Sequence, residues 1–263
     1  MSGRLFAGAV PFLLWGAISS INPGAPSPTR YRIDSKIEQI VDLSAMGQGN
    51  QTTSFTQLAI ISVTLSDTVG GQIMHVVIDS LSSDAPVPSP EILQKARGAW
   101  LHGTVDAWGR GRVTATSADS NEMVSQMKGM MARFFPIIKP GAKEGDAWLD
   151  TAKVDTKTPS QSMKSMTVTT FTHGGSATHD GLPAARIDAA SATSGAGTME
   201  NPMAGTMDVE LHTTATASYF VGSAGRFLGS ESKSDGKSLV RTPMSPDPIP
   251  VAIKQTTMIS VLK

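Results

Sequence analysis

Residues 31–43, YRIDSKIEQIVDL, decide the fold class of this chain. Most of the odd positions carry apolar side chains and most of the even ones carry charged or polar side chains. The apolar positions are Tyr31, Ile33, Ile37, Val41 and Leu43, and the charged ones between them include Arg32, Asp34, Lys36 and Asp42. Because successive side chains of a β-strand point to opposite faces, this period of two predicts a strand with one buried face.

The same alternation recurs along the chain between short turns. It predicts strands at residues 55–66, 72–80, 99–105, 112–116, 165–173, 184–193, 207–220, 226–232 and 251–259. Residues 174–183 are expected to form a loop, and the Asp235-Gly236 dipeptide is expected at a hairpin tip. Short turns between long strands favour antiparallel neighbours, so the first three strands should form a meander.

Two helices are predicted within this β-rich pattern. The first covers residues 90–97, with Ser89 as its N-cap, Pro90 at the first helical position and Gly98 at its end. The second covers residues 120–134 after an N-cap at Asp119. We therefore expect a mainly β fold, all-β or α+β: a large antiparallel sheet, curved into a half-barrel or clam, with the two helices on its concave face.

The N-terminal residues predict export. Arg4 precedes the apolar stretch 5–18, and Ala17-Ile18-Ser19 fits a signal-peptidase site. The apolar stretch is shorter than the roughly 20 residues of a membrane-spanning helix. We expect a signal peptide at 1–19, a flexible linker at 20–29 and one β domain at 30–263, in a periplasmic or extracellular protein without a transmembrane segment in the mature chain. An N-terminal helix that is buried or lies at an interface is the alternative.

Composition narrows the classes of partner. Lys plus Arg equals Asp plus Glu at 22 each, and no basic stripe with interleaved aromatic residues is present, so nucleic acid is not an expected partner. The chain has no cysteine, which excludes disulfides and thiol chemistry. The oligomeric state does not follow from the sequence.

No motif predicts catalysis, a cofactor or a metal. Gly236-Lys237-Ser238 lacks the spacing of a phosphate-binding loop, and two Ser-x-x-Lys spacings, at 230–233 and 234–237, lack their companion motifs. His173, His179 and Asp180 carry ligand atoms, but their spacing across a glycine-rich segment is unspecific. We expect no catalytic and no metal-ligating residues, although a hydrolase built from scattered residues would escape this test.

The second half of the chain resembles a known family. Phe134-Phe135-Pro136 followed by Gly145-Asp146-Ala147-Trp148 is similar to an uncharacterised family of exported bacterial proteins with an F-P segment before a G-D-x-W motif. In outline these proteins resemble half-barrel envelope carriers, in which a curved antiparallel sheet shelters lipid chains around helices. The resemblance implies a fold and a compartment but no catalytic residues.

Two sets of residues are candidates for structural or binding roles. Gly145 permits a turn with positive φ, and Trp148 is expected to be a buried packing anchor. The helical stripe Met123, Met127 and Met131, with Phe134, fits either core packing or an apolar binding surface, because methionine adapts to irregular apolar shapes.

Three functions are compatible with these features. The first is a non-catalytic binding or carrier module for an apolar small molecule or lipid, which would contact Met123, Met127, Met131 and Phe134. The second is a structural or protein-interaction protein of the cell envelope. The third is a hydrolase with an unrecognised site.

Overall fold

The computed structural model describes residues 28–44, 47–85, 90–117, 121–158, 161–201, 205–243, 245 and 247–263. The predicted signal peptide, most of the linker, Asp119 and Ser89 lie outside these ranges. Within them, the structure contains no helix long and apolar enough to cross a membrane.

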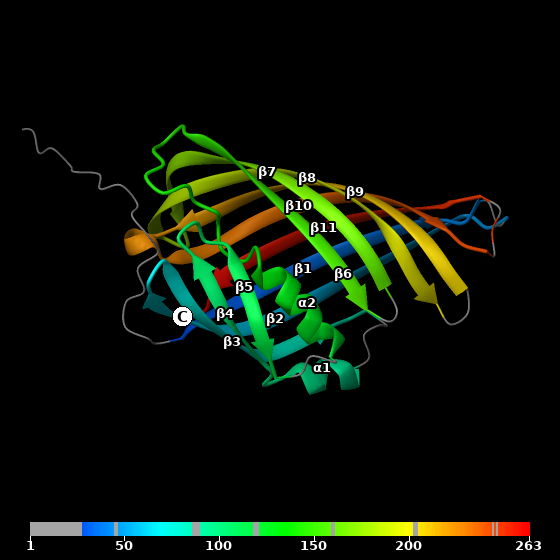
Figure 1. The fold of residues 1–263 in the computed structure, drawn as a ribbon, viewed down its shortest axis with the longest axis horizontal. Helices are drawn as coiled ribbons and strands as arrows, with labels where there is room; N and C mark the ends of the chain where they lie inside the picture. The colour runs from blue at the N-terminus through cyan, green and yellow to red at the C-terminus, as the bar shows by residue number, and fades with distance from the viewer. Residues whose placement is uncertain are drawn as a thin grey trace, which may run out of the picture.

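All eleven strands belong to one antiparallel sheet, which confirms the predicted fold class (Figure 1). The strands are β1 (Thr29–Asp42), β2 (Asn50–Thr68), β3 (Gly71–Ser83), β4 (Trp100–Asp106), β5 (Gly111–Thr116), β6 (Ala147–Thr158), β7 (Gln161–His179), β8 (Leu182–Asn201), β9 (Gly205–Val221), β10 (Phe227–Arg241) and β11 (Ile249–Val261). Figure 1 shows that the sheet curves around the two helices instead of lying flat.

The strand order places the two ends of the chain's β-structure in the middle of the sheet. The order is β5-β4-β3-β2-β1-β11-β10-β9-β8-β7-β6, so β1 pairs with both β2 and β11. Strands β5 and β6 lie at opposite edges and do not pair with each other, which leaves the half-barrel open.

The cross-strand register determines which side chains face the interior. In β1 the odd residues point inward: Ile33 pairs with Ile259 of β11 and Ala59 of β2, and all three are buried. Tyr31 extends this row toward the aromatic cluster, where its hydroxyl donates a hydrogen bond to the carbonyl of Phe227 over 3.1 Å. The alternation read from residues 31–43 is therefore the inward face of the central strand.

Two short helices cover part of the concave face: α1 (Pro90–Ala96) and α2 (Glu122–Met131). The N-cap of α2 is Asn121, whose Oδ1 accepts hydrogen bonds from the amides of Met123 and Val124. The helix thus begins two residues later than the predicted range 120–134 and ends three residues earlier. The helix ends at Met131, and Phe134 and Phe135, which follow it, are buried in the core.

Two local predictions are wrong, each for a physical reason, and one strand was not predicted. Strand β7 runs on through Gly174-Gly175 with a register shift, so that the hairpin turns at Asp180-Gly181 rather than over residues 174–183. Asp235-Gly236 lies inside β10, paired on both sides by β9 and β11, because pairing with two neighbours overrides the turn preference of the dipeptide. Strand β6 was not expected from the sequence.

Candidate binding cavity

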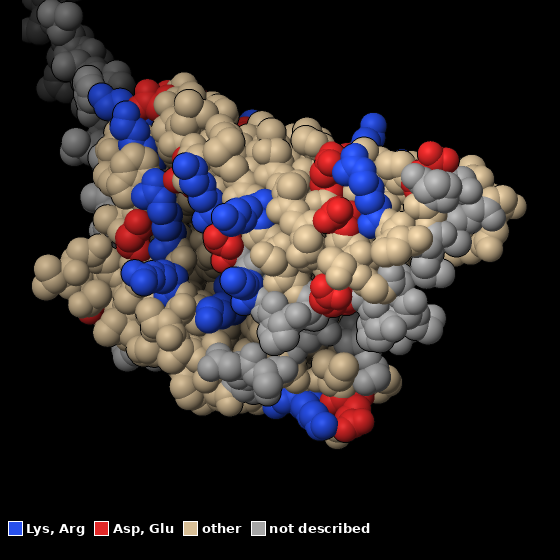
Figure 2. All heavy atoms as spheres, turned by 45° about the vertical axis from the view of Figure 1, so that its right-hand side comes forward, with Lys and Arg blue, Asp and Glu red and all other residues tan. Residues whose placement is uncertain are grey.

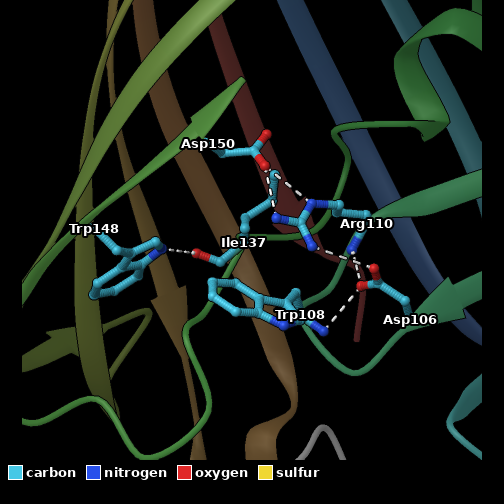
Figure 3. Close-up of polar contacts among 6 residues, drawn as sticks. All are labelled: Asp106, Trp108, Arg110, Ile137, Trp148 and Asp150. Carbon is cyan, nitrogen blue, oxygen red and sulfur yellow. Dashed lines mark hydrogen bonds and ion pairs between the residues drawn. The ribbon is translucent and has the colours of Figure 1, made fainter. Parts of the chain in front are cut away.

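A loop, residues 132–146, connects α2 to β6 and packs against the inner face of the sheet. Trp148, at the start of β6, donates a hydrogen bond from Nε1 to the carbonyl of Ile137 over 3.0 Å (Figure 3). The Trp148 ring is 7% exposed and stacks on Phe171 of β7, with 5.9 Å between ring centroids. Gly145 turns the chain into β6 with φ of 86°. Trp148 therefore attaches the loop to β6 and β7.

An ion pair connects the two open edges of the sheet. Arg110, in the turn between β4 and β5, donates from Nε and Nη2 to Oδ1 of Asp150 in β6, over 3.0 and 2.7 Å (Figure 3). Asp106 holds the turn in shape, because its Oδ1 accepts from the amides of Trp108 and Arg110, each over 2.9 Å. The Arg110 guanidinium also lies over the Trp108 ring, 4.8 Å from its centroid.

The same turn also holds the loop. The amide of Ile138 donates to the carbonyl of Trp108 over 2.7 Å, which joins the β4–β5 turn directly to residues 132–146. The half-barrel is thus bridged from edge to edge at the end where this loop lies. We call the bridge formed by Asp106, Trp108, Arg110 and Asp150 the edge clasp.

A cavity of about 200 Å³ lies between the loop and the inner face of β6 to β10. Its walls combine apolar rings and chains with small side chains: Phe135, Ile137, Phe171, Ala189, Ala215, Ala217, Tyr219, Thr169, Ser191, Thr216 and Ser232, with Arg133 and Asp150 as its charged members. The small residues of β8 and β9 create this space, because alanine and serine occupy inward positions at which larger side chains would fill the concave side of the sheet.

The two charged residues of this cavity, Arg133 and Asp150, differ in whether they have an ion-pair partner. Asp150 is engaged by the Arg110 guanidinium in the edge clasp. Arg133 has no ion-pair partner among the residues that the structure describes. Burial raises the pKa of the Tyr219 hydroxyl, and the nearby Arg133 charge partly opposes that rise in pKa. On the face seen in Figure 2, Lys and Arg side chains lie beside Asp and Glu side chains around a hollow in the surface.

The methionine stripe lies elsewhere, in the larger core beneath β1 to β4. Met123, Met127, Met131 and Phe134 are buried, with exposed fractions of 8, 6, 0 and 1%. Phe134 makes edge-to-face contacts with Tyr31 and Phe227 at 5.1 and 5.4 Å between centroids. These side chains pack against one another and do not line the cavity. The cavity is lined instead by their neighbours Arg133 and Phe135, and contact between the stripe and a ligand stays a prediction.

A larger groove, of about 1130 Å³, crosses the sheet and lies mainly on its outer face, because most of its lining residues, such as Lys36, Ala190 and Lys254, alternate with the inward positions. It is open to solvent and crosses seven strands, β1, β2 and β7 to β11. Charged side chains run through it, including Lys36, Glu38, Lys233, Asp235 and Lys254. Opposite charges stand beside each other there, since Lys254 pairs in register with both Glu38 and Asp235. Paired, solvent-exposed charges of this kind are typical of the outer face of a sheet that contacts water.

The histidines considered as metal ligands are held by other contacts. Nδ1 of His173 accepts a hydrogen bond from the amide of Gly175, and the His179 ring stacks on Phe220 with 4.1 Å between centroids. Among the described residues, no three acidic or histidine side chains form a group that would hold a metal ion. The two Ser-x-x-Lys spacings lie in β10, where each serine and lysine is a ladder residue.

The residues that line the cavity were not predicted from the sequence. They come from five strands and one loop, spread from Arg133 to Ser232, and none belongs to a motif. The available signal was the run of small residues in 184–196 and 213–218, which indicates inner positions that leave space.

Comparisons with known proteins give no relative for this chain. No protein-family model matches it, and no curated protein matches its sequence. Among solved structures it is similar to DynF from the dynemicin biosynthesis pathway of Micromonospora chersina, with 8% identity, a TM-score of 0.23, and coverage of 100% of this chain and 94% of DynF.

Two further similar structures come from Pseudomonas species. OccK9 of Pseudomonas aeruginosa has 7% identity and a TM-score of 0.27, covering 89% of this chain and 98% of OccK9. An outer membrane channel from Pseudomonas putida F1 has 8% identity and a TM-score of 0.20, covering 97% of this chain and 100% of the channel. Similarities this weak carry no argument about function.

Proposed function

We propose that this chain is an exported, non-catalytic binding or carrier protein whose apolar ligand enters the cavity between the loop 132–146 and the inner face of the sheet. The observation that carries the proposal is the cavity itself, with Phe135, Ile137 and Phe171 on one side and alanines on the other. Apolar concave sites with a few polar groups are where small ligands bind. Export is inferred from residues 1–19 of the sequence.

The size of the cavity limits what it holds. Ligand pockets commonly measure roughly 300–1,000 Å³, so a space of about 200 Å³ fits part of a ligand, such as a short segment of an acyl chain. The edge clasp and the loop 132–146 bridge the edges β5 and β6 at this end of the half-barrel, so the remainder of the molecule would lie outside the cavity.

Two adjacent alanines of β8 provide a matched test. Ala189 points inward and lines the cavity, whereas Ala190 is exposed and lies in the outer groove. We expect Nile red, a neutral apolar dye, to show saturable fluorescence enhancement with the wild type. Ala189→Trp should abolish the enhancement by filling the cavity, and Ala190→Trp should leave it unchanged. Circular dichroism checks that both variants fold.

The outcomes separate the candidate functions. Binding that survives Ala189→Trp but not Ala190→Trp would place the ligand on the outer face and refute the cavity proposal. Absence of saturable wild-type binding would also refute it, and would leave a structural or interaction role in the envelope as the better account.

A further inference from the structure

Arg133 has no ion-pair partner among the described residues, in a cavity whose wall also contains apolar side chains, the hydroxyl groups of threonines and serines, and Asp150. Among the described residues, no carboxylate lies within ion-pair distance of its guanidinium, and its recorded hydrogen bond is from the backbone amide to the carbonyl of Met130. By contrast, Arg110 contacts two carboxylates, those of Asp106 and Asp150. A guanidinium presents five N–H donors, and partial burial without acceptors is unfavourable.

The other charged group of the cavity does not balance Arg133. Oδ1 of Asp150 accepts from two nitrogens of Arg110, at 3.0 and 2.7 Å, and the Asp150 side chain is only 10% exposed. Its charge is thus compensated within the edge clasp. Of the two charged residues that line the cavity, Arg133 is therefore the one without a direct ion-pair partner among the described residues.

Tyr219 adds a second donor close to Arg133. Its ring lines the cavity, and its hydroxyl has no hydrogen-bond partner among the described residues. Arg133 and Tyr219 both line this cavity of about 200 Å³, so the two groups border the same small space. A neutral phenol and a guanidinium both offer protons, so the group that satisfies both is an anionic acceptor.

From this arrangement we infer that the ligand is an anionic amphiphile, whose carboxylate pairs with Arg133 and the Tyr219 hydroxyl while its chain packs against Phe135, Ile137 and Phe171. This inference rests on the proposed function and specifies its ligand class. A cationic head group would be repelled by Arg133, and an uncharged one would leave the guanidinium without a counter-charge. The planar fork of arginine matches the two oxygens of a carboxylate.

Isothermal titration calorimetry with two ligands of equal chain length tests the inference. Dodecanoate and dodecanol differ in the head group alone. The wild type should bind dodecanoate about tenfold more tightly than dodecanol, as expected for one charge-assisted hydrogen-bonded pair. Arg133→Gln should abolish this preference and leave dodecanol binding unchanged, and Tyr219→Phe should reduce the preference in part.

The control variant is Arg112→Gln, which removes the same charge from an exposed position of β5. It should retain the preference for dodecanoate. Equal wild-type affinity for the two ligands, or an undiminished preference in Arg133→Gln, would overturn the head-group inference while Nile red binding still supported the carrier function. Failure of both ligands and of Nile red to bind would overturn both proposals together.

Discussion

Trp148 connects three parts of the molecule through one side chain: the β6 edge, the Phe171 ring of β7 and the carbonyl of Ile137 in the loop 132–146. Trp148→Ala removes a buried indole and leaves that carbonyl without its donor. We expect a loss of about 3–5 kcal/mol in the free energy of unfolding, measured from denaturant midpoints.

The neighbouring residue supplies the control for this substitution. Leu149 is 66% exposed, and Leu149→Ala should change the free energy of unfolding by no more than about 0.5 kcal/mol. Similar midpoints for the two variants would show that Trp148 is not the anchor of this region.

The two tyrosines of the chain give a spectroscopic prediction. Burial raises the pKa of both Tyr31 and Tyr219 in the folded protein. The Tyr31 hydroxyl also donates a hydrogen bond to the carbonyl of Phe227, and ionisation of the hydroxyl would break that hydrogen bond. The tyrosines of the native protein should therefore ionise at higher pH than those of the unfolded chain, which titrate with a pKa of about 10.

The sign of the effect on stability follows from the same shifts. Above about pH 10 the unfolded chain has lost protons that the folded chain still binds, so the free energy of unfolding falls as pH rises. Below that pH the contribution is fully present. Tyrosinate absorbance that appears near pH 10 without unfolding would contradict the burial of these two hydroxyls.

At the scale of elements, helix α2 depends on its N-cap. Asn121 accepts from two helix amides, and its Nδ2 donates to the carbonyl of Ile92 over 3.2 Å, at the α1 helix. Asn121→Ala should cost about 1 kcal/mol, measured by thermal unfolding. Asn121→Asp keeps the acceptor and should recover most of the loss. Equal losses in both variants would show that the contact with Ile92, and not the cap, is what stabilises the helix.

The elements differ in how far the sequence could predict them. The central strands β1 to β3 alternate over most of their buried parts because one face is buried and the other is exposed, so their positions followed from the pattern. Strand β6 is an edge strand in which Thr151, Lys153, Val154 and Asp155 are all exposed, so no buried face marks its second half.

The C-terminal end of β8 shows a different limit to prediction from the sequence. Residues 194–201 of β8 are mostly glycine and small polar residues, yet they pair with β7 and β9 in continuous register. The position of the cavity also could not be predicted, since inward alanines such as Ala189 and Ala217 acquire meaning only when β8 and β9 lie side by side. Propensity is a local property, whereas pairing and space depend on tertiary contacts.

The whole molecule is an open half-barrel whose two edges are joined at one end by the ion pair between Arg110 and Asp150. One part of its interior is filled by the aromatic and methionine core, and another encloses the cavity. The central claim is that an apolar ligand occupies this inner space and not the larger groove on the outer face.

Photo-crosslinking tests this claim most directly. The protein is mixed with a fatty acid that carries a diazirine next to its head group, and the sample is irradiated. Tandem mass spectrometry then locates the adducts. The account predicts adducts on the inward residues Phe135, Phe171, Ala189 and Ala217, suppressed by excess dodecanoate. Adducts confined to outward residues such as Val168, Ala190 and Thr214, or labelling that dodecanoate does not suppress, would contradict it.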